Sequence, residues 1–150
     1  MIGVTWKETL TGSWHRLSAP SVEHRCVVEV TVIMPKVSEL LGNTVVEIQG
    51  RVSLEGLATD REFKGTLGLG SLIRERRVPY AFTVIADDGR PYRFDGAKEV
   101  NVLKLPTSIT TLGAYIFDET GEEVGRAILR GDFREEALEF IRSFRAILLK

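Results

Sequence analysis

Apolar and polar residues alternate along two neighbouring segments of the chain. In residues 26–34 the apolar residues 26, 28, 30, 32 and 34 share one face, while Glu29 and Thr31 interrupt the other. Residues 44–55 repeat the pattern more cleanly, with charged or polar side chains between the apolar ones. A period of two with many β-branched residues is typical of a strand that buries one face, as the strands of antiparallel sheets do. We predict two antiparallel strands here, joined by a short helical turn at residues 35–43 that Gly42 can end.

A β-hairpin is predicted in the middle of the chain. Residues 77–86 and 92–97 are strand-like segments that flank the sequence Asp-Asp-Gly-Arg-Pro at residues 87–91. Gly89 can supply the positive φ that a short hairpin loop requires.

A second hairpin and two further strands complete the predicted sheet. Residues 119–122 form a turn between the apolar runs 109–117 and 124–129, and a further strand is expected around residues 7–17. Segment 63–72 contains three glycines, which inside a strand mark bends or a close approach of backbones. We therefore expect about eight or nine strands in an antiparallel meander, which avoids free edges best by curling into a barrel or half-barrel.

The period of the pattern changes near the C-terminus. Asp132 can cap the first turn of a helix, and Glu135 can return the hydrogen bond three residues later. From there apolar residues recur at helical spacing as far as Leu148, while arginine and glutamate fill the opposite side. We predict an amphipathic helix over about residues 132–148 that packs on the sheet.

Size and charge narrow the function classes. The chain has 150 residues, of which 43% are hydrophobic, as expected for one globular domain over residues 1–150. Its formal net charge of −1 provides no field that attracts polyanions, so we expect no nucleic-acid partner. The N-terminus lacks the pattern of a signal peptide, and no apolar run approaches the roughly 20 residues of a membrane span. A single cysteine, Cys26, favours a reducing, cytoplasmic location.

Metal binding and catalysis find little support in the residue spacing. His24 and Cys26 lie two apart in a predicted strand and so share a face, and His15 could lie opposite them across a turn at residues 18–21. A zinc site needs three or four such ligands, and no further pair completes this set, so we interpret the three as ordinary strand residues. Neither histidine has the context of a nucleophilic triad. We expect no catalytic residue, metal or cofactor, while a carboxylate pair assembled only in space stays open.

Aromatic residues are the most informative candidates. Several fall on positions that alternation turns inward, where they either fill a small barrel or line a cavity for one ligand. The candidate ligand-binding residues are Trp6, Trp14, Tyr80, Phe82, Tyr92, Phe94 and Tyr115.

Several short motifs resemble a known family. They are the sequences Trp-Lys-Glu-Thr-Leu-Thr-Gly at residues 6–12, Gly-Ala-Lys at 96–98, Ile-Thr-Thr-Leu at 109–112 and Gly-Asp-Phe at 131–133. Together they resemble a β-rich accessory domain that accompanies cholesterol-oxidase-like members of the glucose-methanol-choline oxidoreductases and some α/β-hydrolases. The resemblance implies a lipocalin-like barrel associated with lipid or sterol chemistry, and it carries over no catalytic residue because the chain has no flavin-binding segment.

These observations favour a non-catalytic binding module. We expect a lipocalin-like barrel that holds a small apolar, lipid- or sterol-like molecule, or that accompanies an enzyme acting on one. The alternative is a structural or interaction protein with a filled barrel, which acts through its surface or as a homodimer.

Overall fold

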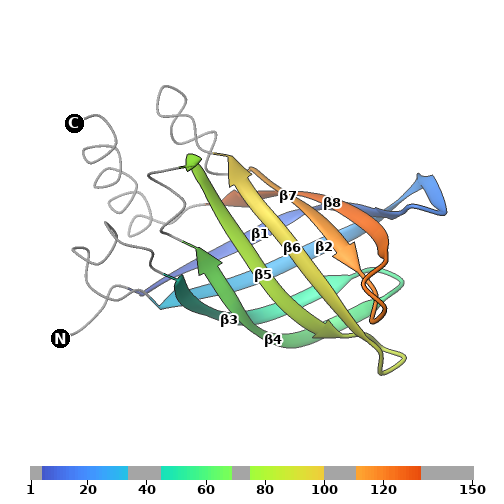
Figure 1. Ribbon diagram of the computed structural model, residues 1–150, viewed down its shortest axis with the longest axis horizontal. Coiled ribbons are helices and arrows are strands. Elements are labelled where there is room, and N and C mark those ends of the chain that lie inside the picture. The colour runs from blue at the N-terminus through green and yellow to red at the C-terminus, as the bar shows by residue number, and fades with distance from the viewer. Residues whose placement is uncertain (1–4, 34–44, 69–74, 100–110, 133–150) are drawn as a thin grey trace.

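Eight antiparallel strands form a closed barrel. The computed structural model describes residues 5–33, 45–68, 75–99 and 111–132. The strands are β1 (Thr5–Arg16), β2 (Ala19–Ile33), β3 (Val45–Leu54), β4 (Ala58–Gly68), β5 (Arg77–Ile85), β6 (Pro91–Glu99), β7 (Thr111–Phe117) and β8 (Glu123–Asp132). Each strand pairs with its neighbour in sequence, and β1 also pairs with β8, so the sheet has no free edge (Figure 1).

The strand and hairpin predictions are confirmed, and the predicted meander is a full barrel. The loops between β5 and β6 and between β7 and β8 contain Gly89 and Gly121, whose φ angles are 85° and 86°. The helical turn predicted at residues 35–43 and the helix predicted at about residues 132–148 lie outside the described residues, apart from Asp132 at the end of β8.

Three glycines let the strands bend into a cylinder. A Cβ atom on Gly12, Gly50 or Gly65 would overlap a backbone carbonyl oxygen of the adjacent strand. Only glycine permits so close an approach of the neighbouring backbone. The close backbone approach expected for the glycine-containing segment is therefore present at Gly65 in β4.

The two ends of the barrel differ. The turns at residues 17–18, 55–57, 86–90 and 118–122 all lie at one end, which we call the hairpin end (Figure 1). At the other end, which we call the terminal end, β1 begins and β8 stops.

Inward-facing side chains form one continuous apolar core. It includes a stack of three rings in the middle of the barrel, in which the centroid of Phe82 lies 4.0 Å from that of Phe63 and 4.6 Å from that of Phe94.

Within the described part of the chain, no helix is long and apolar enough to cross a membrane.

Candidate functional site

A polar cluster lies inside the apolar barrel towards the terminal end. It consists of Glu8 on β1, Tyr80 on β5 and Lys98 on β6, and we call it the interior polar cluster. Strand alternation brings the three side chains together, because Glu8 shares the inward face of β1 with Leu10, and Lys98 shares that of β6 with Phe94.

The cluster is tightly hydrogen-bonded. The Lys98 Nζ donates to both carboxylate oxygens of Glu8, at 2.6 Å to Oε1 and 2.8 Å to Oε2. The Tyr80 hydroxyl donates to Glu8 Oε1 at 3.3 Å, and the Lys98 ammonium lies 5.2 Å from the centre of the Tyr80 ring. The side chains of Lys98 and Glu8 are only 3% and 1% exposed, so water screens the pair very little.

Burial shifts the pKa values of Tyr80 and Lys98. It raises the pKa of Tyr80 well above its usual value, and the Glu8 charge and hydrogen bond add to that shift. Burial also lowers the pKa of Lys98, while the charge and hydrogen bonds of Glu8 oppose the change. Tyr80 therefore stays protonated as a hydrogen-bond donor.

A buried ion pair of this kind adds little to stability. Desolvation of two charges costs several kcal/mol per ion, which their attraction only partly offsets, and apolar replacements are often neutral or stabilising. A buried ion pair that adds little to stability is instead a candidate for binding a ligand.

The hairpin end of the interior is filled by Trp14. Its ring is 1% exposed and its Nε1 donates to the carbonyl of Glu55 at 3.2 Å. Gly125 on β8 makes room for the ring, because a Cβ there would lie 3.2 Å from the indole carbons. His24 lies beside the indole with ring centroids 5.2 Å apart. Access to the interior from this end is therefore blocked.

Four of the seven candidate aromatic residues lie inside the barrel. Trp14 fills the hairpin end, Phe82 and Phe94 belong to the ring stack, and Tyr80 contributes its hydroxyl to the interior polar cluster.

The remaining three candidates lie elsewhere. Tyr92 is half-buried at the margin of the core, and Trp6 is placed by its backbone, opposite Val32 on β2. Tyr115 lies on the outer surface, where its side chain is 47% exposed and the Arg126 guanidinium lies 5.2 Å from its ring. The inward positions of β7 belong to the alternate residues Ala114 and Ile116, because side chains point to opposite faces in turn.

His15, His24 and Cys26 do not form one site. His15 borders a groove on the outer surface, whereas Cys26 is fully buried in the core. Burial raises the pKa of Cys26 to about 12, so its thiol is a poor nucleophile and ligand. Across the described strands, no three histidine, cysteine, aspartate or glutamate residues come together as metal ligands.

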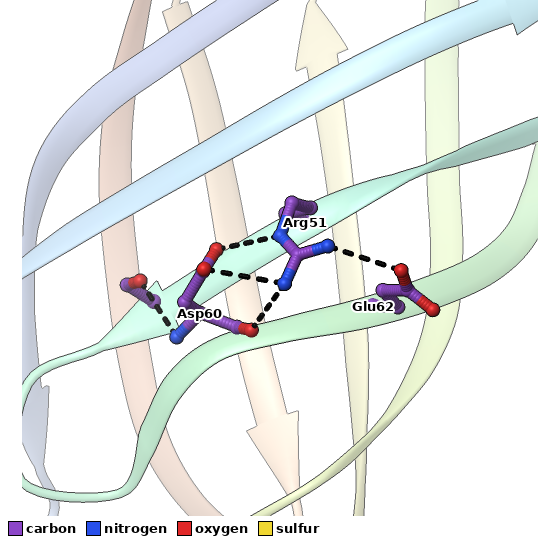
Figure 2. Close-up of polar contacts among 4 residues, drawn as sticks. Arg51, Asp60 and Glu62 are labelled. Carbon is purple, nitrogen blue, oxygen red and sulfur yellow. Dashed lines mark hydrogen bonds and ion pairs between the residues drawn. The ribbon is translucent and has the colours of Figure 1, made fainter.

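Outer-surface charges support a strand irregularity. Arg51 on β3 donates through Nε to Asp60 Oδ1 at 2.7 Å, through Nη2 to the Asp60 carbonyl at 3.1 Å, and through Nη1 to Glu62 at 3.0 Å (Figure 2). Asp60 has a φ of 46° where the β3–β4 register shifts. The hydrogen bond from Arg51 lowers the pKa of Asp60. These contacts hold a bulge in place and do not form a concave site.

Sequence reasoning missed Glu8 and Lys98 as site residues. Both belong to motifs that carry the family resemblance, and both share strand parity with apolar neighbours, which is the signal that could have identified them. A charged residue on the apolar parity of a strand is worth singling out because such residues are rarely buried without a partner.

No family model, curated protein or solved structure matches the chain.

Proposed function

We propose that the barrel is a non-catalytic binding module for a small apolar molecule that carries one polar group. The observation that supports this most directly is the interior polar cluster of Glu8, Tyr80 and Lys98, which faces the barrel axis within an otherwise apolar core. Ligand sites in proteins combine apolar walls with a few well-placed polar groups, and the mouth of a β-barrel is a common location for them.

We propose that the ligand enters the barrel at the terminal end. Trp14 and the ring stack fill the hairpin end and the middle of the barrel. A ligand would therefore enter at the terminal end and lie with its polar group near Glu8 and Lys98.

The family resemblance agrees with this proposal. We propose a cytoplasmic accessory domain of the type found with cholesterol-oxidase-like oxidoreductases, acting beside an enzyme that handles a lipid- or sterol-like substrate. The closed meander barrel is the architecture that this resemblance implies.

The test is a binding measurement on a matched pair of variants. The full-length protein is titrated with apolar alcohols and sterols, using calorimetry and displacement of a fluorescent lipid probe. In the variant E8L/K98M the interior loses its polar groups, and binding of a polar-headed ligand should weaken at least about tenfold, which equals 1.4 kcal/mol.

The control makes the same kinds of change outside the barrel. Arg77 and Glu99 pair at 3.2 Å on the outer faces of β5 and β6, and both are exposed. The variant R77M/E99L should bind as the wild type does. The proposal fails if no alcohol or sterol binds the wild-type protein, or if both double variants bind alike.

A second candidate function is supported by the outer surface. A groove of about 750 Å³ crosses the outer faces of β1, β6, β7 and β8, and Ile128 and Tyr115 border it with 64% and 47% of their area exposed. Exposed apolar side chains that border a groove favour an interaction surface. Sedimentation of the wild type and of I128E tests it, because a dimer that uses this face should dissociate in the variant.

A further inference from the structure

The outer face formed by β1, β8, β7 and β6 matches itself about a two-fold axis. These strands follow one another around the barrel (Figure 1). We propose that this face binds the same face of a second copy of the chain, with the axis running parallel to β7 and β8 and between them. The inference rests on the second candidate function, the interaction surface along the outer groove, and adds the partner and the arrangement of the two copies.

The pairing of β7 with β8 defines the contacts of such a dimer. Gly113 lies opposite Ile128, and Tyr115 lies opposite Arg126, and all four residues are exposed on the outer surface. In a two-fold dimer, a residue that contacts a second residue in the partner is matched by the reverse contact. An axis between β7 and β8 therefore places each residue against its own cross-strand neighbour in the second copy.

The central pair has complementary shapes. Ile128 projects from β8 with 64% of its area exposed, whereas a Cβ on Gly113 would meet nothing within 4 Å. The neighbour of Gly113 on β6 is Ala97, so the surface beside it is low as well, and all three residues border the groove. In the dimer, Ile128 of each copy fills the space above Gly113 of the other, and two exposed aliphatic side chains leave water.

The charges of the groove favour a second copy over a polyanion. The charged side chains that line it in the described strands comprise two basic and two acidic ones: Arg77, Arg126, Glu23 and Glu99. Such a balanced face does not repel its own copy, and it offers no net field to a nucleic acid.

The ends of the row that contains Tyr115 and Arg126 also match. His15 on β1 follows Arg126 in this row, and Asp95 on β6 follows Tyr115. The axis places His15 of one copy against Asp95 of the other, so an imidazole donor meets a carboxylate. Asp95 also pairs with Arg93 at 2.8 Å, and a carboxylate has acceptor positions for both partners. Arg126 meets a second Tyr115 ring, of the kind that it already approaches within its own chain.

Two charge variants test the arrangement by sedimentation velocity. Gly113→Glu places a carboxylate in the open space, and Ile128→Lys replaces the projecting aliphatic side chain with an ammonium. The dimer of either variant would bury two charges without partners, so each variant alone should associate at least about tenfold more weakly than the wild type.

An equimolar mixture of the two variants should recover the dimer. In the mixed dimer, the new carboxylate of one chain meets the new ammonium of the other, while Ile128 of the first chain meets Gly113 of the second as in the wild type. The mixture should therefore associate at least about tenfold more tightly than either variant alone.

The matched control is Val45→Lys on β3. Val45 has the same exposed fraction as Ile128, 64%, and its strand lies on the opposite side of the barrel from β7. This variant should associate as the wild type does. In dilute solution, where the copies are separate, all three variants should unfold at the wild-type urea concentration, because each changed residue is exposed.

The outcomes separate this inference from the candidate function on which it rests. If the wild type stays monomeric up to about 1 mM, the second copy is not the partner and the inference is overturned. If the wild type associates and neither groove variant weakens it, this face is not an interface, and the candidate function fails too. If both variants weaken association and the mixture does not recover it, the interaction surface stands but the two-fold arrangement is wrong.

Discussion

Replacing Lys98 with methionine tests whether the barrel interior holds a desolvated charge. Methionine keeps an unbranched apolar stem but removes the ammonium that donates to Glu8 at 2.6 and 2.8 Å. Glu8 then remains as a lone charge whose side chain is 1% exposed. Removing one partner of a buried pair costs about 3–5 kcal/mol of unfolding free energy. For a domain of this size, that corresponds to a fall in melting temperature of roughly 6–20 °C.

The double variant E8L/K98M separates the cost of a lone charge from the value of the pair. With both charges gone and apolar side chains in their place, stability should return to the wild-type value or exceed it by about 1–4 kcal/mol. The measurement is urea denaturation followed by circular dichroism and tryptophan fluorescence, with the single variant Glu8→Leu completing a double-mutant cycle.

The matched control is Arg77→Met on the neighbouring strand. Arg77 pairs with Glu99 on the outer surface, where the two side chains are 46% and 76% exposed, so its removal should cost no more than about 1 kcal/mol. The reasoning is refuted if Lys98→Met and Arg77→Met lose similar stability, because the interior pair would then be as well solvated as the surface one.

Three further predictions concern curvature, core packing and pH. Gly12→Ala should cost about 1–3 kcal/mol because its methyl group overlaps the Ile128 carbonyl, whereas Gly113→Ala, with open space around it, should be neutral or slightly stabilising in the same urea assay. Phe82→Ala should cost about 3–5 kcal/mol because its ring is the middle one of three, while Ile128→Ala on the surface should change the unfolding free energy by less than about 0.5 kcal/mol. Because the pKa of Cys26 is raised from 9.0 to about 12 in the fold, its contribution to stability is complete below pH 9.0 and is lost as the pH rises towards 12. Cys26→Ala should flatten that alkaline decline in unfolding free energy, and the native thiol should resist alkylation until the protein unfolds.

Strands with clean alternation were predictable because their period reports directly which face is buried. The pattern at residues 44–55 corresponds to β3, in which Val46, Ile48, Val52 and Leu54 are all buried. The start of β4 was not predictable in the same way. Residues 58–62 are largely polar, and the bulge at Asp60 breaks the alternation, so the segment lacks a strand's period although Arg51 holds it in the sheet.

The candidate site was harder to predict because it is assembled from distant parts of the chain. Glu8 and Lys98 meet only when β1 and β6 curve around the same axis, and no spacing along the sequence encodes that distance. Tyr115 was hard to place for a different reason, which lies within its own strand. Its strand has apolar residues on both faces, so composition alone could not decide which set points inward.

The pairing of β1 with β8 limits when the barrel can close during synthesis. Of the eight strands, β1 leaves the ribosome first and β8 last, yet Thr9 pairs with Asp132. Until β8 has emerged, one side of β1 lacks its native partner, so the circle cannot close before that strand has been made. A polypeptide released early would keep that side unpaired, and unpaired strand edges promote association between nascent chains.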